Sequence, residues 1–187
     1  TLVGVKPMAN DNETPLSTVG FLPLTGHEGS VLEGEYVAII QHPLGSTKKL
    51  ALRNNRVIDV FSDFVHYTTD TDPGASGAPV LNDYWQTVAI HHAGVKRKDS
   101  NGRILAIDGS VWSPEMGEDR IAYLANEGVQ IRSILVHLRS LIDIPPEKRV
   151  LIDELLMAAE LTPQSAGGPV EQVDAVERAE DELATAF

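Results

Sequence analysis

One stretch of the sequence, residues 69–82 (TDTDPGASGAPVLN), combines residue types that can carry out acyl-transfer chemistry. It places the hydroxyl of Ser76 between Gly74 and Gly77, and Pro73 restricts the backbone just before them. Glycine reaches backbone conformations that a Cβ closes to other residues, so such a loop can point two amide N–H groups in the same direction. A serine beside two free amides has the outline of a nucleophile next to an oxyanion hole, for which Gly74 and Ser76 are the predicted donors.

The same four residues, Gly-Ala-Ser-Gly, are also compatible with a simple turn, and the surrounding pattern bears on the choice. Residues 64–69 upstream (FVHYTT) alternate as a strand does. Residues 79–81 and 87–91 downstream form a predicted hairpin. A serine on a loop between β-strands differs from the strand-to-helix elbow of the α/β-hydrolases. The loop is therefore predicted to belong to an antiparallel β structure.

The segment Asp72–Val80 (DPGASGAPV), followed by Val88–Gly94 (VAIHHAG), resembles the nucleophile region of the chymotrypsin/trypsin-like serine peptidases. The similarity covers residues 34–141 and is greatest with the cysteine-free bacterial V8-like branch, which includes glutamyl endopeptidases. The sequence departs from the trypsins at Ala75 and Ala78, and neither side chain is needed for the chemistry. The resemblance implies a hydrolase, a trypsin-like serine endopeptidase.

In that family the mechanism assigns a role to each matching position. Ser76 attacks the peptide carbonyl, and the backbone N–H groups of Gly74 and Ser76 stabilise the tetrahedral oxyanion. The backbone of His92, Ala93 and Gly94 pairs with a polypeptide substrate as an added strand. The resemblance implies no metal and no organic cofactor.

Three residues stand at positions that select the substrate's P1 side chain in the family. In the V8-like branch a Thr and a His at the positions of Thr71 and His91 bind an acidic side chain, and a hydroxyl and an imidazole can both donate to a carboxylate. Asp70 stands where trypsin keeps the acid that binds Lys and Arg. The resemblance therefore favours an acidic P1 residue, with a basic P1 residue as the alternative.

The strand pattern predicts one antiparallel barrel. At 187 residues the chain is long enough for a single domain with a sizeable core. Short β-type runs separated by turns number about six, the count of one barrel. Four lie at residues 36–41, 50–52, 56–61 and 104–107, and two further strands bracket the serine loop, one at residues 64–69 and one that begins at residue 79. The expected fold class is mainly β: the second barrel of a two-barrel trypsin-like protease, followed by C-terminal helices.

We divide the chain into four segments on this basis. Residues 1–33 are predicted to be a crossing segment and inter-barrel connection, in which Phe21–Leu24 anchors against the barrel. Residues 34–130 form the predicted barrel, residues 131–160 the C-terminal helices, and residues 161–187 an acidic linker or tail.

Two helices are predicted after the barrel. Apolar residues recur at helical spacing over residues 131–141, with Ser133 as a possible cap. A second helix begins at Pro145–Pro146 and runs to about Glu160. Its apolar stripe, formed by Leu151, Leu155 and Leu156, is interpreted as a docking surface. We therefore expect residues 145–187 to contact a regulatory protein or a further domain.

The general-base His and the orienting Asp of the family lie on a first barrel, for which this chain has no length ahead of Ser76. We expect both residues on an N-terminal protease half, either from the same precursor by proteolytic processing or on a companion chain, and we expect no activity without it. The chain's own His27, His42 and His66 are interpreted as surface or packed residues. A non-catalytic, peptide-binding pseudoprotease remains the alternative.

Composition excludes several function classes. The formal net charge of −12 argues against a nucleic-acid partner, because phosphate would be repelled. No apolar run approaches the length of a membrane span, so no membrane partner is expected. The absence of cysteine fits a reducing compartment or a bacterial secreted enzyme, and bacterial cytoplasm is slightly favoured. The first residues contain neither an initiator Met nor a signal peptide, which predicts a processed or truncated chain.

Overall fold

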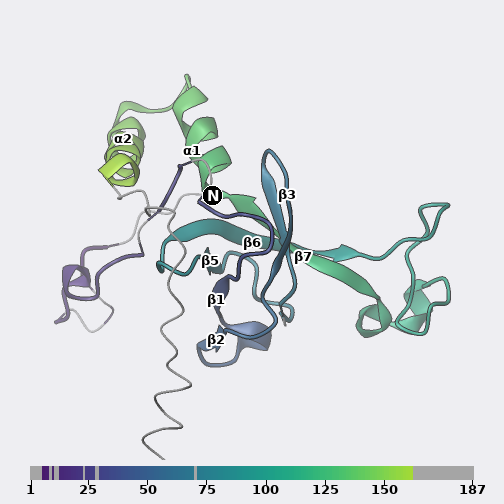
Figure 1. The fold of residues 1–187 in the computed structure, drawn as a ribbon. Coiled ribbons are helices and arrows are strands. Elements are labelled where there is room, and N and C mark those ends of the chain that lie inside the picture. Colours follow the sequence, from purple (N-terminus) through teal and green to yellow (C-terminus); the bar gives the residue numbers. More distant parts are fainter. Residues whose placement is uncertain are drawn as a thin grey trace, which may run out of the picture.

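The computed structural model describes residues 6–8, 10, 13–22, 24–27, 30–69 and 71–161. Within these residues seven strands form one antiparallel sheet in the order β2-β1-β5-β6-β7-β4-β3 (Figure 1). The strands are β1 (Ala38–Gln41), β2 (Lys49–Ala51), β3 (Val57–Val60), β4 (Phe64–Tyr67), β5 (Pro79–Leu81), β6 (Thr87–Lys96) and β7 (Tyr123–Gln130).

The sheet closes through the segment that precedes β1. The amide of Val57, at the start of β3, donates to the carbonyl of Glu35 at 2.8 Å. The amide of Val37 donates to the carbonyl of Asn55 at 2.9 Å. These bonds join the segment before β1 to the strand at the far end of the sheet, and closure removes edges that would otherwise stay unpaired. The predicted mainly β, antiparallel barrel is confirmed.

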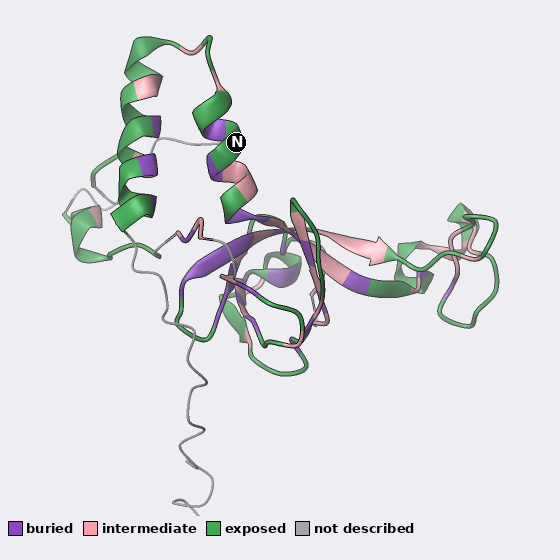
Figure 2. Cartoon of the chain, turned by 45° about the horizontal axis from the view of Figure 1, so that its top comes forward, coloured by how far each residue is buried: buried purple, intermediate pink, exposed green. Residues whose placement is uncertain are grey.

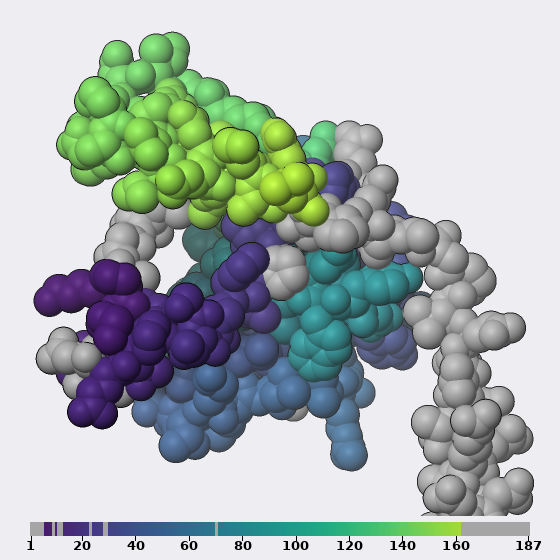
Figure 3. Space-filling model, turned by 90° about the vertical axis from the view of Figure 1, so that its left-hand side faces the viewer, coloured from purple at the N-terminus to yellow at the C-terminus, as the bar shows by residue number. Residues whose placement is uncertain are grey.

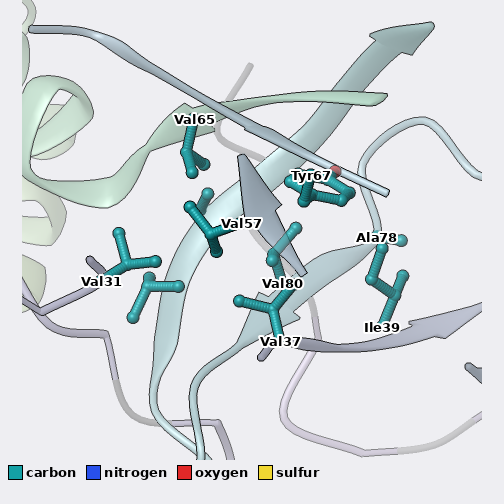
Figure 4. Packing of buried hydrophobic residues seen from close by; sticks show 10 residues of the cluster. Val31, Val37, Ile39, Val57, Val65, Tyr67, Ala78 and Val80 are labelled. Carbon is teal, nitrogen blue, oxygen red and sulfur yellow. The ribbon is translucent and has the colours of Figure 1, made fainter. Parts of the chain in front are cut away.

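The barrel interior is filled by alternate side chains of its strands, as the two-residue period of a strand requires. In β1 and β4 buried and half-buried residues alternate. Ile39, Val65 and Val80 are completely inaccessible to solvent and pack in one cluster with Tyr67 (Figure 4). This cluster lies directly beneath the strands that carry the serine loop.

Replacing Ile39 by alanine is expected to lower the free energy of unfolding by about 2–5 kcal/mol, because the side chain is fully buried and its loss leaves a cavity. Urea unfolding followed by circular dichroism measures this change. Leu50→Ala on neighbouring β2 is the control, because Leu50 is 47% exposed and should change the free energy by about 0.5 kcal/mol or less. Equal effects at the two positions would contradict the placement of the core.

Two helices follow the barrel, α1 (Ile131–Ser140) and α2 (Pro146–Leu161). They lie side by side at the end of the sheet (Figures 1 and 2) and pack through a second apolar cluster. Ile90 of β6 and Leu24 contact this cluster, which therefore fastens the helix pair to the barrel. Figure 3 shows α2 and the N-terminal residues on one face of the molecule. None of the helices in the described ranges is long and apolar enough to cross a membrane.

Two details of the predicted helices were wrong. Ser133 is not the cap of α1: Gln130 holds that position, and the Ser133 hydroxyl instead donates to the carbonyl of Ser62 at 3.1 Å. The buried face of α2 differs from the predicted stripe, because Leu151 is 59% exposed whereas Ile152 is buried with Leu156. The face of α2 that packs on α1 therefore contains Ile152 in place of Leu151.

The expected anchor at Phe21–Leu24 is also only partly correct. Phe21 is 87% exposed, so its ring contributes nothing to the core. Leu24 supplies the contact instead, because it forms a parallel bridge with Thr87 and packs against the helix cluster. Pro23 lies outside the described residues.

The expected strand at residues 104–107 was wrong, and β7 was not recognised as a strand. Residues 97–122 form an arm that projects from the barrel between β6 and β7 (Figure 1). Ile104, Leu105 and Ala106 make single bridges to different partners within this arm rather than a continuous ladder. Most of the arm is exposed (Figure 2), which explains why an apolar run there does not mark a core strand.

Candidate active site

Ser76 lies in the loop between β4 and β5 and is exposed to solvent. Its hydroxyl donates to the backbone carbonyl of His92 at 3.4 Å. Two backbone bonds hold the loop against β6: the amide of Gly77 donates to the carbonyl of His91 (2.8 Å), and the amide of His91 donates to the carbonyl of Ala78 (2.9 Å). The hydroxyl is thus fixed at the edge of the barrel and remains open to an incoming substrate.

The amide groups of Gly74 and Ser76 are available for an oxyanion. Within the described part of the chain neither N–H donates to a protein acceptor, whereas the intervening amide of Ala75 donates to the carbonyl of Asp72 at 3.1 Å. Gly74 has φ +100°, a conformation that residues with a Cβ rarely adopt. Two unbonded donors beside the hydroxyl match the arrangement expected for stabilising a tetrahedral intermediate.

A neighbouring turn fixes the orientation of the Gly74 amide. The turn spans Pro43–Gly45, and the amide of Leu44 donates to the carbonyl of Pro73 at 2.8 Å. In a trans peptide the C=O and N–H groups point in opposite directions, so this bond holds the Gly74 N–H pointing away from Leu44. A Cβ added to Gly74 would lie 3.3 Å from the carbonyl oxygen of His42. The turn therefore acts as the back wall of the predicted oxyanion hole.

A pocket of about 280 Å³ opens beside Ser76. Four of the residues predicted to bind substrate line it: Thr71, His91, Ala93 and Gly94. The structure thus brings the predicted nucleophile and most of the predicted substrate-binding residues to one place. Asp70 lies outside the described residues.

His92 takes part through its backbone rather than through its ring. The register of β6 on β7 shifts between His91 and Ala93, so His92 sits in a β-bulge. Its side chain is 56% exposed, and its Nε2 lies 3.9 Å from a carboxylate oxygen of Glu127. Bulges are frequent next to active sites because they redirect a strand locally. Here the bulge places the His92 carbonyl where it accepts the hydrogen bond of the Ser76 hydroxyl.

Tyr67 supports His91 from beneath the pocket. The Tyr67 hydroxyl lies 2.8 Å from Nδ1 of His91, and Tyr67 is completely buried. Burial raises the pKa of Tyr67 well above its ordinary value, and the nearby Glu127 carboxylate adds to this. Burial also lowers the pKa of His91, and the adjacent His92 lowers it further. Both groups are consequently uncharged at neutral pH.

Asn126 of β7 supports the threonine side of the pocket. Its Nδ2 donates to the carbonyl of Thr69 at 2.6 Å, and its Oδ1 accepts from the Thr71 hydroxyl at 2.6 Å. Because the carbonyl of Thr69 can only accept, it fixes which end of the Asn126 amide faces Thr71. The Thr71 side chain is held by this chain of bonds.

Sequence reasoning missed Tyr67, Asn126 and Tyr123 as parts of the site. Tyr67 pairs with Asn126 between β4 and β7, and Asn126 also pairs with Gly94 between β7 and β6. The ring of Tyr123 lies over Gly94, where an added Cβ would come within 2.6 Å of it. No motif in the sequence marks these contacts, because they depend on strand register across the sheet.

None of the six histidine rings, all of which lie in the described ranges, forms a hydrogen bond there with Ser76, whose hydroxyl bonds only to the His92 backbone. His42 Nδ1 contacts the carbonyl of Ser46 at 3.1 Å. His66 pairs with Glu127 at 2.9 Å, and His91 is held by Tyr67. No Ser–His dyad is present in this part of the chain. The described residues also contain no group of three or more His, Asp or Glu side chains arranged to hold a metal ion.

An exposed serine on a glycine loop of a closed antiparallel barrel, with a pocket beside it and two amides that make no hydrogen bond among the described residues, is the arrangement found at serine hydrolase sites of the trypsin type. The family model of the trypsin-like peptidase domain matches residues 2–90, which include the whole serine loop. Over these residues the chain is similar to the trypsin-like peptidase family.

Two further similarities were found. An uncharacterized Sinorhizobium fredii protein, y4fB, is 33% identical over 174 residues, which is 85% of this chain and 26% of that protein. The chain thus spans about a quarter of the length of this relative. A solved structure of a Glu endopeptidase in complex with MPD is 22% identical, with a TM-score of 0.43, and the match covers 67% of this chain and 48% of that one.

Proposed function

We propose that this chain is the nucleophile-bearing half of a serine endopeptidase. The observation that carries the proposal is the exposed Ser76 hydroxyl beside the unbonded amides of Gly74 and Ser76, at the mouth of a side-chain pocket. A loop that served only as a turn would have no need of a pocket or of two unused donors. Because Gly74 and Ser76 are exposed, the hydroxyl and both amides are accessible to a substrate carbonyl.

The chemistry follows from these groups. A histidine supplied by an N-terminal protease half takes the proton of Ser76 as Oγ attacks the substrate's carbonyl carbon. The new oxyanion accepts hydrogen bonds from the amides of Gly74 and Ser76. The histidine then gives its proton to the leaving amine as the C–N bond breaks. Water hydrolyses the acyl-enzyme by the same steps in reverse order, and an aspartate from the same half orients the histidine.

The substrate backbone has a place to bind along β6. Strand β5 pairs with β6 only as far as Ile90, and the loop adds two backbone bonds at His91. From His92 to Gly94 that edge of β6 carries no strand among the described residues. An extended peptide can add there in antiparallel orientation, with its P1 side chain entering the pocket lined by Ala93 and Gly94.

The histidine and aspartate are the part of the mechanism that this chain does not provide within its described residues. The rings of His42, His66 and His91 contact the Ser46 carbonyl, Glu127 and Tyr67 rather than Ser76. We propose that both residues lie on an N-terminal half, in the same precursor or on a companion chain. The isolated chain is then inactive.

The finer assignments are also proposals. The positions of Thr71 and His91 suggest a member of the V8-like branch with an acidic P1 preference, and Asp70 suggests a basic preference as the alternative. Residues 145–187 are proposed to contact a regulatory protein or a further domain. Bacterial origin, proteolytic processing and a cytoplasmic location extend the same interpretation.

A non-catalytic, peptide-binding pseudoprotease is the second candidate. It is favoured by one observation, that no histidine ring within the described residues hydrogen-bonds to Ser76. In this case the pocket and the β6 edge would hold a peptide without cleaving it.

Labelling with a fluorophosphonate probe separates the two functions, because the probe modifies only an activated serine. The protein at its natural length should be labelled at Ser76, as located by peptide mass spectrometry, and the 187-residue chain alone should be labelled at least about 10³-fold more slowly. Ser76→Ala at natural length is the control and should not be labelled. An unlabelled natural-length protein would establish the pseudoprotease instead.

A further inference from the structure

The pocket beside Ser76 has a hydrogen-bonding capacity that the protein itself determines. The hydroxyl of Thr71 gives its proton to Oδ1 of Asn126, and that of Thr69 gives its proton to the carbonyl of Thr68 at 2.6 Å. The Asn126 amide cannot flip to present its NH₂ group to Thr71, because its Nδ2 donates to the Thr69 carbonyl. Both threonines line the pocket, and each is left with lone pairs to offer. The part of the pocket lined by Thr69 and Thr71, here called the threonine wall, therefore accepts hydrogen bonds.

His91, another residue that lines the pocket, presents a hydrogen-bond donor instead. The buried hydroxyl of Tyr67 has one proton, and Nδ1 of His91 is its partner among the described residues. If Nδ1 carried a proton instead, the Tyr67 proton would be buried without an acceptor, at a cost of about 1–3 kcal/mol. Nδ1 is thus the acceptor, and the neutral His91 ring carries its proton on Nε2. His91 is a pocket-lining residue and presents an N–H donor, not a cation.

The charge around the pocket points the same way. No Lys or Arg is among the described residues that line it, and a carboxylate, Asp72, lies at its rim. Glu127 is close enough to Tyr67 to raise the pKa of that hydroxyl. An anionic side chain entering the pocket would lose water without gaining a cationic partner, which is unfavourable.

We propose that this pocket selects a neutral carboxamide side chain, that of glutamine, at P1 rather than the carboxylate of glutamate. The inference rests on the proposed function for the position of P1, and it replaces the acidic preference that the family positions of Thr71 and His91 suggest. The amide oxygen accepts from Nε2–H of His91, and the amide NH₂ donates to the hydroxyl oxygens of Thr71 and Thr69. A carboxylate satisfies His91 but meets acceptors at the threonine wall. A lysine ammonium meets the donor of His91.

Binding of product-like peptides tests the inference without requiring catalysis. Acetylated tetrapeptide acids that differ only in the last residue (Gln, Glu, Lys or Ala) are titrated into the 187-residue chain by calorimetry. The Gln peptide should bind about tenfold more tightly than the Glu and Lys peptides, because each of those leaves one polar contact in the pocket unfavourable. Tighter binding of the Glu or Lys peptide, equal binding of all four, or no binding would overturn the inference.

Paired variants show whether the pocket groups are the cause. Thr71→Val removes the acceptor and should reduce the Gln-over-Glu ratio to about threefold or less, whereas Thr71→Ser keeps the hydroxyl and should retain the ratio. ¹⁵N NMR of the His91 ring should show the proton on Nε2, and Tyr67→Phe should produce a mixture of tautomers. An unchanged ratio in Thr71→Val, or a proton on Nδ1 in the wild type, would contradict the assignment.

The outcomes also separate this inference from the peptidase proposal. Ser76 labelling together with a preference for Glu would overturn the carboxamide pocket and leave the peptidase proposal standing. A preference for Gln without Ser76 labelling at natural length would support the pocket and point to a peptide-binding pseudoprotease.

Discussion

Ser76→Ala in the natural-length protein is expected to reduce kcat by about 10⁶-fold, because loss of the nucleophile removes the covalent route and leaves only the contribution of binding and the oxyanion hole. Cleavage of a fluorogenic peptide measures the change. The fold should be unaffected, since Ser76 is exposed and its single hydrogen bond to the His92 carbonyl is long.

Ser110→Ala is the matched control for this experiment. Ser110 is an exposed serine in the arm, and its hydroxyl donates to Asp108 at 2.7 Å, far along the chain from the serine loop. Its replacement should leave kcat within about twofold of the wild type. Full activity in Ser76→Ala would show that the hydrolysis has another nucleophile and would end the peptidase proposal for this loop.

Gly74→Ala is expected to reduce kcat/KM by about 10²–10³-fold, the loss associated with one oxyanion-hole donor. At φ +100° an alanine is strained, and its Cβ would lie 3.3 Å from the His42 carbonyl and 3.4 Å from the Leu44 nitrogen. The Pro73–Gly74 peptide must then rotate or shift away from the turn that fixes it. Steady-state kinetics with the peptide substrate, together with the rate of fluorophosphonate labelling, measure the effect.

Gly102→Ala separates the loss of the oxyanion hole from a general cost of strain. Gly102 also has a positive φ, +78°, but nothing lies within 4 Å of an added Cβ, and it belongs to a turn of the projecting arm. Both variants should lose stability to a similar extent, while only Gly74→Ala loses activity. Equal activity of the two variants would contradict the assignment of the Gly74 amide as an oxyanion donor.

The nucleophile loop was accessible to sequence reasoning because its chemistry is local. Gly74, Ser76 and Gly77 are consecutive or nearly so, and the backbone freedom of glycine is a property of the residue itself. The barrel strands on either side were also predictable, since alternation of apolar residues reports which face of a strand is buried. The same reasoning failed at residues 104–107, where an apolar run lies in a largely exposed arm and makes only single bridges to different partners.

By itself the sequence determined the resemblance to the trypsin-like peptidases, the serine loop and the barrel class, because each depends on residues close together in the chain. Only the tertiary structure decided what the pocket offers a substrate. Tyr67, His91 and Asn126 come from three different strands, and they meet because β4, β7 and β6 are neighbours in one register. Whether a histidine donates or accepts depends on the partner that reaches its other nitrogen, and that partner is chosen by packing across the sheet.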